Sequence, residues 1–299
     1  MIRNCHRILG HKASIYALCR GMRPSEFFTS GGDGLLVRWS LDNPDEGVAV
    51  ANAGIQIFSI AAVPEKNLVL AGDMNGGLHW IDLADAQNIR SETAHSCGVF
   101  SILPLDDRLL TGGGKGKLNV WSLEKGELIS SLPVTNTSIR AIAFSSLRNE
   151  VALACSDNCI YLLDAETLEV RQVISQAHNS SVFALAYTRS GQVLYSGGRD
   201  ALLNAWQLEP EPQLLKSVPA HNYTINALQL ICEEKYLVTA SRDKTLKVWD
   251  SESLELLKVL ETVRDDGHRH SVNRLLWMEE FEKLVSVSDD RSGIIWELG

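Results

Sequence analysis

The chain has 299 residues, of which 45% are hydrophobic and 22% charged, and its formal net charge is -9. This length allows either two ordinary domains or one large one, and the acidic balance disfavours nucleic acid or an anionic membrane as the main partner. No stretch reaches the roughly 18 apolar residues that a membrane-spanning helix needs, and the N-terminus lacks the apolar run of an export signal.

The six cysteines lie scattered along the chain without a CxxC pair: Cys5, Cys19, Cys97, Cys155, Cys159 and Cys232. This distribution favours buried small hydrophobic residues in a reducing compartment over a disulfide framework. We therefore expect a soluble, cytoplasmic protein with no membrane partner.

One short segment recurs seven times along the chain, each time before an aromatic or aliphatic anchor. In chain order the anchors are Trp39, Ile81, Trp121, Leu163, Trp206, Trp249 and Trp296. Successive anchors are 42, 40, 42, 43, 43 and 47 residues apart, so no stretch remains for a second domain. The repeat predicts a single domain over residues 1–299.

Each copy contains short β-branched or apolar runs separated by Gly, Asp, Asn or Pro. The sixth copy shows the pattern most clearly, with runs at 225–231, 236–239 and 246–249 and a fourth at 256–260 that leads into the next copy. We predict four short antiparallel strands per copy.

A Gly-His or Ala-His pair stands upstream of five anchors, at His11, His95, His178, His221 and His268. With these pairs, the chain resembles the WD-repeat (Trp-Asp) β-propeller family over essentially its whole length. The resemblance implies an all-β, seven-bladed propeller of four-stranded antiparallel blades. Because the last copy ends after three strands, we expect residues 2–9 to complete the seventh blade and close the ring.

In WD-repeat propellers a His, a Ser or Thr, a turn Asp and the Trp form a buried hydrogen-bonded tetrad. Four copies match this pattern fully: His11, Thr29, Asp33 and Trp39; His178, Ser196, Asp200 and Trp206; His221, Thr239, Asp243 and Trp249; His268, Ser286, Asp290 and Trp296. Each polar atom of such a set can find a partner in the next. A hydrolytic triad would need one accessible copy, so fourfold repetition favours a structural role.

Three copies depart from the tetrad pattern. The second has Ala53, Ala71, Asn75 and Ile81 at the four positions, and the fourth has Thr135, Leu153, Asp157 and Leu163. We interpret these as largely apolar sets that pack without the network. The third keeps His95, Thr111 and Trp121 but places Lys115 at the Asp position, so we expect this lysine to face solvent.

Two other segments suggest chemistry but fit it poorly. The run GGGKGK at 112–117 lacks the spacing of a phosphate-binding loop and favours a tight strand-to-strand turn. In VRDDGHRH, Asp265, Asp266, His268 and His270 could be imagined as metal ligands, but a solvated loop is the simpler interpretation. We predict no catalytic residues, metal or cofactor.

Function must then come from residues that the scaffold displays. In family members the residues three and five positions after the His, and the residue before the turn Asp, face the rim of the central channel. From these positions we predict a partner-binding set: Tyr16, Phe58, Met74, Phe100, Arg140, Phe183, Arg199, Asn226, Arg242 and Asn273. Aromatic, Met and Arg residues are enriched at the centres of protein interfaces.

This set gives an apolar arc and a cationic arc, and it favours a non-catalytic scaffold that binds a protein or peptide, acidic or phosphorylated. The alternative for these residues is that the aromatic rings pack between blades and the arginines pair with neighbouring carboxylates. The alternative functions are an enzyme built on the propeller and, third, a nucleic-acid binder that uses the arginines. We expect a monomer.

Overall fold

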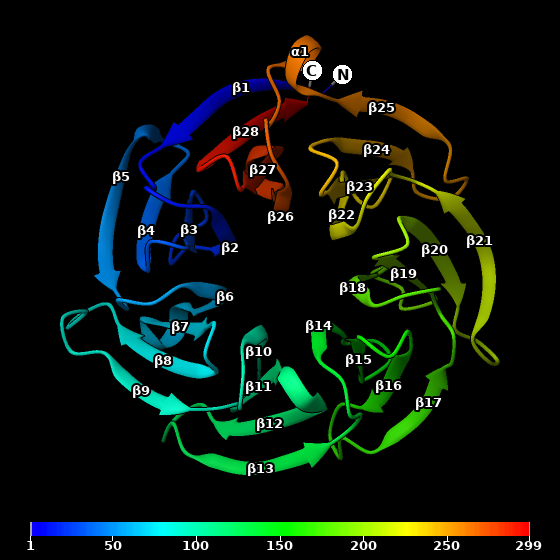
Figure 1. The fold of residues 1–299 in the computed structure, drawn as a ribbon, viewed down its shortest axis with the longest axis horizontal. Coiled ribbons are helices and arrows are strands. Elements are labelled where there is room, and N and C mark those ends of the chain that lie inside the picture. The colour runs from blue at the N-terminus through cyan, green and yellow to red at the C-terminus, as the bar shows by residue number, and fades with distance from the viewer. Residues whose placement is uncertain (1, 299) are drawn as a thin grey trace.

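The computed structural model describes residues 2–298, which form seven four-stranded antiparallel sheets arranged around a central axis (Figure 1). In each sheet the strands follow chain order from the centre outward, except that the seventh takes its outermost strand from the N-terminus. The predicted all-β, seven-bladed propeller is confirmed. We number the blades 1 to 7 from the sheet that begins with β2.

Every blade runs from an innermost strand at the channel to an outermost strand at the edge of the ring. The innermost are β2 (Ile15–Arg20), β6 (Ile57–Val63), β10 (Val99–Leu105), β14 (Ile139–Ser145), β18 (Val182–Tyr187), β22 (Ile225–Ile231) and β26 (Val272–Met278). The second are β3 (Glu26–Gly31), β7 (Leu68–Asp73), β11 (Arg108–Gly113), β15 (Glu150–Cys155), β19 (Val193–Gly198), β23 (Tyr236–Ser241) and β27 (Lys283–Ser288). The third are β4 (Leu35–Ser40), β8 (Gly77–Asp82), β12 (Lys117–Ser122), β16 (Ile160–Asp164), β20 (Leu202–Gln207), β24 (Leu246–Asp250) and β28 (Ser292–Leu298). The outermost are β5 (Asn43–Asn52), β9 (Arg90–Thr93), β13 (Leu128–Pro133), β17 (Val170–Ile174), β21 (Gln213–Pro219), β25 (Leu256–Leu260) and, for blade 7, β1 (Ile2–Leu9).

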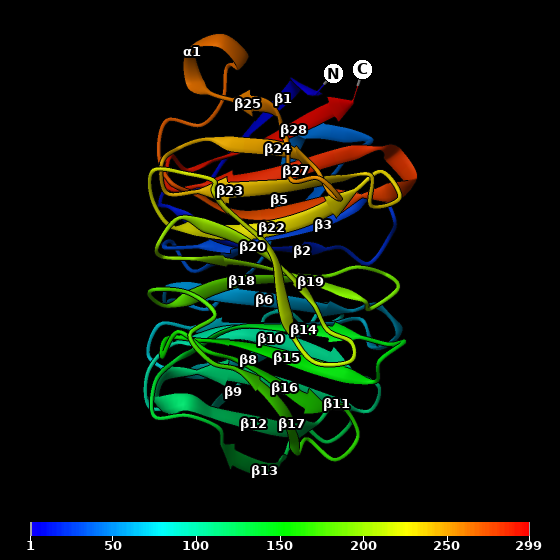
Figure 2. The same ribbon diagram turned by 90° about the vertical axis from the view of Figure 1, so that its right-hand side faces the viewer.

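The ring closes through main-chain hydrogen bonds between the two ends of the chain. Strand β1 pairs antiparallel with β28, from Ile2 opposite Leu298 to Leu9 opposite Ser292, with a bulge between Asn4 and His6. The expectation that residues 2–9 complete the seventh blade is thus confirmed. The short helix α1 (Thr262–Asp265) projects beside both termini at the outer edge (Figure 2).

The hydrophobic core of the described residues is divided into seven clusters, each between two neighbouring blades. Between blades 6 and 7, for example, Trp296 is fully buried against Leu246, Trp277 and Leu284. Each blade is too thin to bury its faces alone, so stacking against two neighbours provides the core.

The turns between second and third strands share one backbone feature in the four blades with a full tetrad. The residue after the turn Asp has a left-handed conformation: Gly34, Ala201, Lys244 and Arg291, with φ from 65° to 78°. In blade 3, η2 (Gly114–Gly116) replaces this turn, and Lys115 itself has a φ of 61°. The GGGKGK segment is therefore a tight turn between β11 and β12.

The cysteine prediction holds only in part. All six are free thiols, and Cys155 is buried, but Cys5 and Cys97 are exposed. Cys5 lies on the outermost strand of its blade and Cys97 in the loop before β10, where neighbouring strands cannot cover them. Within residues 2–298, no helix is long and apolar enough to cross a membrane.

Candidate functional site

The four full tetrads are continuous hydrogen-bonded chains. In blade 6 the Trp249 indole donates to Thr239 Oγ1 at 3.0 Å, Thr239 Oγ1 lies 2.6 Å from His221 Nε2, and His221 Nδ1 lies 2.9 Å from Asp243 Oδ2. The sets of blades 1, 5 and 7, centred on His11, His178 and His268, repeat these contacts. The hydroxyl at the centre of each chain is fully buried, so no substrate can reach it.

Charge within the tetrad of blade 6 is fixed by its hydrogen bonds. Burial disfavours the charged form of Asp243, but hydrogen bonds from His221, Thr245 and the Asn222 amide outweigh burial and lower the pKa of Asp243. Burial also lowers the pKa of His221, although Asp243 opposes this change. The pair therefore consists of a neutral imidazole, whose Nδ1–H donates to the ionised carboxylate of Asp243.

Blade 3 lacks the carboxylate end of the tetrad. His95 Nε2 lies 3.0 Å from Thr111 Oγ1, which also accepts from the Trp121 indole at 3.1 Å. Lys115 is exposed, as the sequence suggested. Burial lowers the pKa of His95 to about 4, and nearby Lys117 acts in the same direction.

Blades 2 and 4 pack with Ala71, Ile81, Leu153 and Leu163 buried at tetrad positions, as predicted, but they also contain polar networks that the sequence did not indicate. In blade 2, Asp73 Oδ2 lies 2.9 Å from His79 Nε2, and His79 Nδ1 lies 2.8 Å from Ser91 Oγ. In blade 4, Tyr161 donates to Asp157 at 2.8 Å. His79 and Tyr161 lie on the third strand, two residues before the anchor. This is not one of the four tetrad positions, so the tetrad pattern does not indicate either network.

The predicted channel residues gather around one cavity. The residue five positions after the His, or its equivalent, lies in the innermost strand of every blade: Tyr16, Phe58, Phe100, Arg140, Phe183, Asn226 and Asn273. All seven line a cavity of about 220 Å³, together with Arg274. Residues far apart in the chain thus meet at one end of the central channel.

A β-bulge places these side chains in the channel. In every blade the pairing of the first two strands shifts register at this residue, for example between Ile15 and Ala17, which leaves Tyr16 unpaired. A bulge redirects a side chain and interrupts the alternation of faces. The sequence did not predict this bulge, because nothing in a single sequence marks the unpaired residue.

Aromatic rings and one guanidinium form a continuous stack along the cavity. Tyr16 meets Phe58 edge to face with ring centres 5.7 Å apart, and Phe58 stacks on Phe100 at 5.8 Å. The Arg140 guanidinium lies 4.4 Å from the centre of Phe100 and 5.2 Å from that of Phe183. These four aromatic rings and the Arg140 guanidinium therefore form one connected surface.

The other predicted residues differ in exposure and in the hydrogen bonds that they make within the ring. Met74, Arg199 and Arg242 are exposed, but they do not line the cavity. Asn226 instead donates to Ser271 Oγ and Val272 O of blade 7, and Asn273 donates to Ile15 O of blade 1 and to Asp289. These two asparagines join neighbouring blades, and part of their hydrogen-bonding capacity is used within the ring.

The arginines do not form the ion pairs that the alternative interpretation required. Within residues 2–298, Arg140, Arg199 and Arg242 have no carboxylate within 4.0 Å. Arg140 donates only to the Ser156 hydroxyl, at 2.9 Å. Burial lowers the pKa of Arg140, nearby Cys97 acts in the opposite direction, and repulsion from Arg199 adds to the effect of burial. The channel mouth thus carries positive charge that the chain itself does not neutralise.

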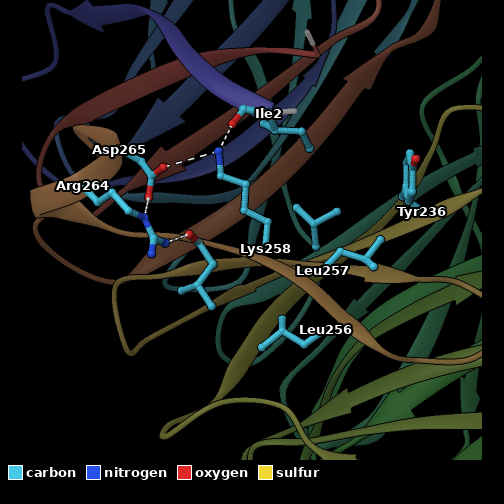
Figure 3. A pocket seen from close by; sticks show the side chains of 9 residues that line it. Ile2, Tyr236, Leu256, Leu257, Lys258, Arg264 and Asp265 are labelled. Carbon is cyan, nitrogen blue, oxygen red and sulfur yellow. Dashed lines mark hydrogen bonds and ion pairs between the residues drawn. The ribbon is translucent and has the colours of Figure 1, made fainter.

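A larger cavity, of about 700 Å³, lies outside the ring, where blade 6 meets the end of β1 (Figure 3). Its apolar wall includes Leu256 and Leu257 on β25, while Lys258 contacts both Ile2 O and Asp265 at the polar end. Arg264 also pairs with Asp265, so this carboxylate contacts two cations. Asp265 is thereby engaged, and Asp266 contacts Arg7, which leaves no ligand set in this loop. Within residues 2–298, no three His, Cys, Asp or Glu side chains gather around a metal position.

Comparison with known proteins identifies the repeats. The family model described as WD domain, G-beta repeat matches residues 170–207 and 212–250, which contain the inner three strands of blades 5 and 6. Blades 5 and 6 of the propeller therefore contain WD repeats. The WD40 β-propeller domain of Doa1 superposes on all of this propeller with a TM-score of 0.87 at 20% identity, and the match covers 97% of that chain. At this identity the likeness concerns the fold alone.

Curated relatives match half of the propeller. Eukaryotic translation initiation factor 3 subunit I is 31% identical over 168 residues in Bombyx mori and 29% identical over 173 residues in Drosophila virilis. Each match covers 52% of this chain, and it covers 50% and 52% of those relatives, respectively. The chain thus spans about half the length of the relatives it matches.

Proposed function

We propose that this propeller is a non-catalytic scaffold that binds a protein or peptide at the mouth of its central channel. The observation that carries the proposal is the cavity of about 220 Å³ where stacked Tyr16, Phe58 and Phe100 adjoin Arg140. Large aromatic side chains and arginine give the most binding energy per residue at protein interfaces. One surface offers both kinds of anchor.

The charge of this surface favours a partner with acidic or phosphorylated residues. Arg199 and Arg242 are exposed, Arg199 lies near enough to Arg140 to repel its charge, and none of the three has a carboxylate within 4.0 Å in the described chain. Guanidinium groups bind carboxylates and phosphates through paired charge-assisted hydrogen bonds. A partner that supplies such groups would relieve the repulsion between Arg140 and Arg199.

Two further observations support a scaffold over an enzyme. The residues that line the channel-mouth cavity include no Asp, Glu, His or Cys, so they offer no general acid, base or nucleophile. The names of the relatives describe a subunit, that is, a component of a protein assembly. We infer that this propeller also works by holding other proteins.

The test replaces Arg140, Arg199 and Arg242 together by Ala. The partner is first identified by affinity purification from the native source and mass spectrometry, and its Kd is then measured by calorimetry for both proteins. We expect the triple variant to bind at least about 100-fold more weakly, since each lost charged contact costs about 1.5–3 kcal/mol. Circular dichroism checks that the variant is folded.

A matched control removes three exposed cations from the loops at the opposite end of the strands, at Arg23, Lys66 and Lys125. It changes net charge equally, so a loss of binding in both variants would point to overall electrostatics. Unchanged binding by the channel variant would disprove the proposal. Binding to single-stranded nucleic acid that weakens steeply with salt would favour the nucleic-acid alternative instead.

A further inference from the structure

Below the channel mouth lies a second ring of seven residues, one from each innermost strand. Each is the first paired residue after the bulge, and six of the seven are small: Ala17, Ser59, Ser101, Ala141, Ala184 and Ala227. In blade 7 this position is Arg274. All seven line a cavity of about 200 Å³. One long cation therefore enters a ring of otherwise small side chains.

Arg274 has almost no partner within the chain. Within residues 2–298 its one hydrogen bond goes from Nη1 to the carbonyl of adjacent Asn273, at 3.0 Å, and no carboxylate lies within 4.0 Å. Burial alone lowers the pKa of Arg274. Arg274 is partly buried and lines the cavity, so its guanidinium is available to an anion that enters the channel.

The two cavities share a cationic lining. Arg140 and Arg274 line both, from blades on opposite sides of the ring, and no Asp or Glu lines either one. Each volume is well above the ~10–15 Å³ that a single water requires, so a polyatomic anion with some hydration can enter. Phe100 and Phe183 hold Arg140 in place, which limits the entropy lost on binding.

We propose that the channel is an oxyanion site, in which a phosphate or carboxylate group binds between Arg140 and Arg274. If the scaffold function also holds, the bound partner inserts this phosphate or carboxylate group into the channel. Only this identification of the source of the anion rests on the proposed scaffold function. Arg274 distinguishes the two proposals, because it lines both cavities but is not one of the three arginines replaced in the test of the scaffold function.

The test measures binding of pyrophosphate alone to the full chain, by calorimetry in low-chloride buffer, with Arg274→Ala as the main variant. Alanine occupies this position in four other blades, so the fold accommodates it. We expect binding to weaken at least tenfold. We also expect the anion-free variant to melt no lower than the wild type, because a partly buried charge without a counter-charge is removed. Arg274→Gln, which keeps a long polar side chain, serves as a second variant.

Lys12→Ala is the matched control, because Lys12 is exposed in the loop before β2 and lies outside both cavities. It should bind pyrophosphate as the wild type does. Equal binding by Arg274→Ala and the wild type would overturn the proposal, and so would a wild type that binds neither pyrophosphate nor a carboxylate.

Two peptides of equal length, one with phosphoserine and one with glutamate, identify the source of the anion. If either peptide binds in an Arg274-dependent manner, the group is carried by a polypeptide. If only pyrophosphate does, the ligand is a free phosphate. If Arg274→Ala loses pyrophosphate but keeps the native partner, the anion site stands and the partner does not use it. If the triple rim variant keeps the partner, only the scaffold proposal fails.

Discussion

Blades 6 and 3 contain the same buried chain of indole, hydroxyl and imidazole, but only blade 6 ends it with a carboxylate. In blade 6 His221 Nδ1 lies 2.9 Å from Asp243, whereas in blade 3 the corresponding position is the exposed Lys115. Both blades nevertheless pack their tryptophan against the preceding blade. The comparison suggests that packing of the indole holds a blade in place and that the carboxylate sets the ionisation of the histidine.

The largest effect should come from removing the tryptophan, in either blade. Trp249 and Trp121 are buried in the clusters of their blades, and each donates a hydrogen bond to a buried threonine. We expect Trp249→Ala and Trp121→Ala each to lower the free energy of unfolding by about 3–5 kcal/mol, through a cavity and an unsatisfied hydroxyl. Urea denaturation measures both.

Trp249→Phe and Trp121→Phe serve as controls, since they keep most of the packing and lose only the N–H donor. Each should cost about 1 kcal/mol. If both Ala variants lose less free energy of unfolding than the Phe variants, indole packing does not stabilise the blades.

The second largest effect should be a pH dependence that is stronger in blade 3 than in blade 6. The pKa of His95 is about 4 in the fold and about 6.5 in the unfolded chain, so its protonation favours unfolding. The contribution of neutral His95 is present above pH 6.5 and is lost as the pH falls from 6.5 to 4, by up to about 3 kcal/mol. We therefore expect the stability difference between the wild type and His95→Asn to narrow across this range.

His221→Asn is the matched comparison for blade 6. Asp243 offsets part of the effect of burial on the pKa of His221. The stability difference between the wild type and His221→Asn should therefore narrow less than the difference for His95→Asn. Urea denaturation at pH 7.5, 6, 5 and 4.5 follows both pairs. Equal narrowing in the two blades would show that the carboxylate does not control the imidazole.

The third effect concerns the carboxylate directly. Asp243→Ala removes the acceptor of His221 and of the Asn222 and Thr245 amides, which leaves partly buried donors unsatisfied. We expect a loss of about 1–3 kcal/mol in the free energy of unfolding, less than for Trp249→Ala. A loss greater than that of Trp249→Ala, measured in the same urea series, would contradict the ranking drawn from blade 3.

The sequence predicted the repeat, the strands and the ring closure because these depend on local patterns: spacing of anchors, turn residues and a missing strand at one end. It also placed His, Thr, Asp and Trp of blade 6 in one set. It did not find the Asp73–His79 pair, Arg274 or the bulge at Tyr16. The Asp73–His79 pair and the bulge depend on strand register, and the surroundings of Arg274 depend on side chains from other blades. The spacing of residues along one copy shows neither.

The smallest effect should come from Lys115→Ala, and it isolates what blade 3 does without a carboxylate. The Lys115 side chain is exposed, and both residues are ordinary L-residues at its φ of 61°, so the substitution adds no new backbone strain. We expect a change within about 0.5 kcal/mol in urea denaturation at pH 7. Asp243→Ala, at the corresponding position of blade 6, should cost several times more. If Lys115→Ala destabilised the protein as much as Asp243→Ala does, Lys115 would have a partner in the ring, and blade 3 would hold its histidine by a different network. A small effect would mean that indole, hydroxyl and imidazole suffice to hold a blade between its neighbours.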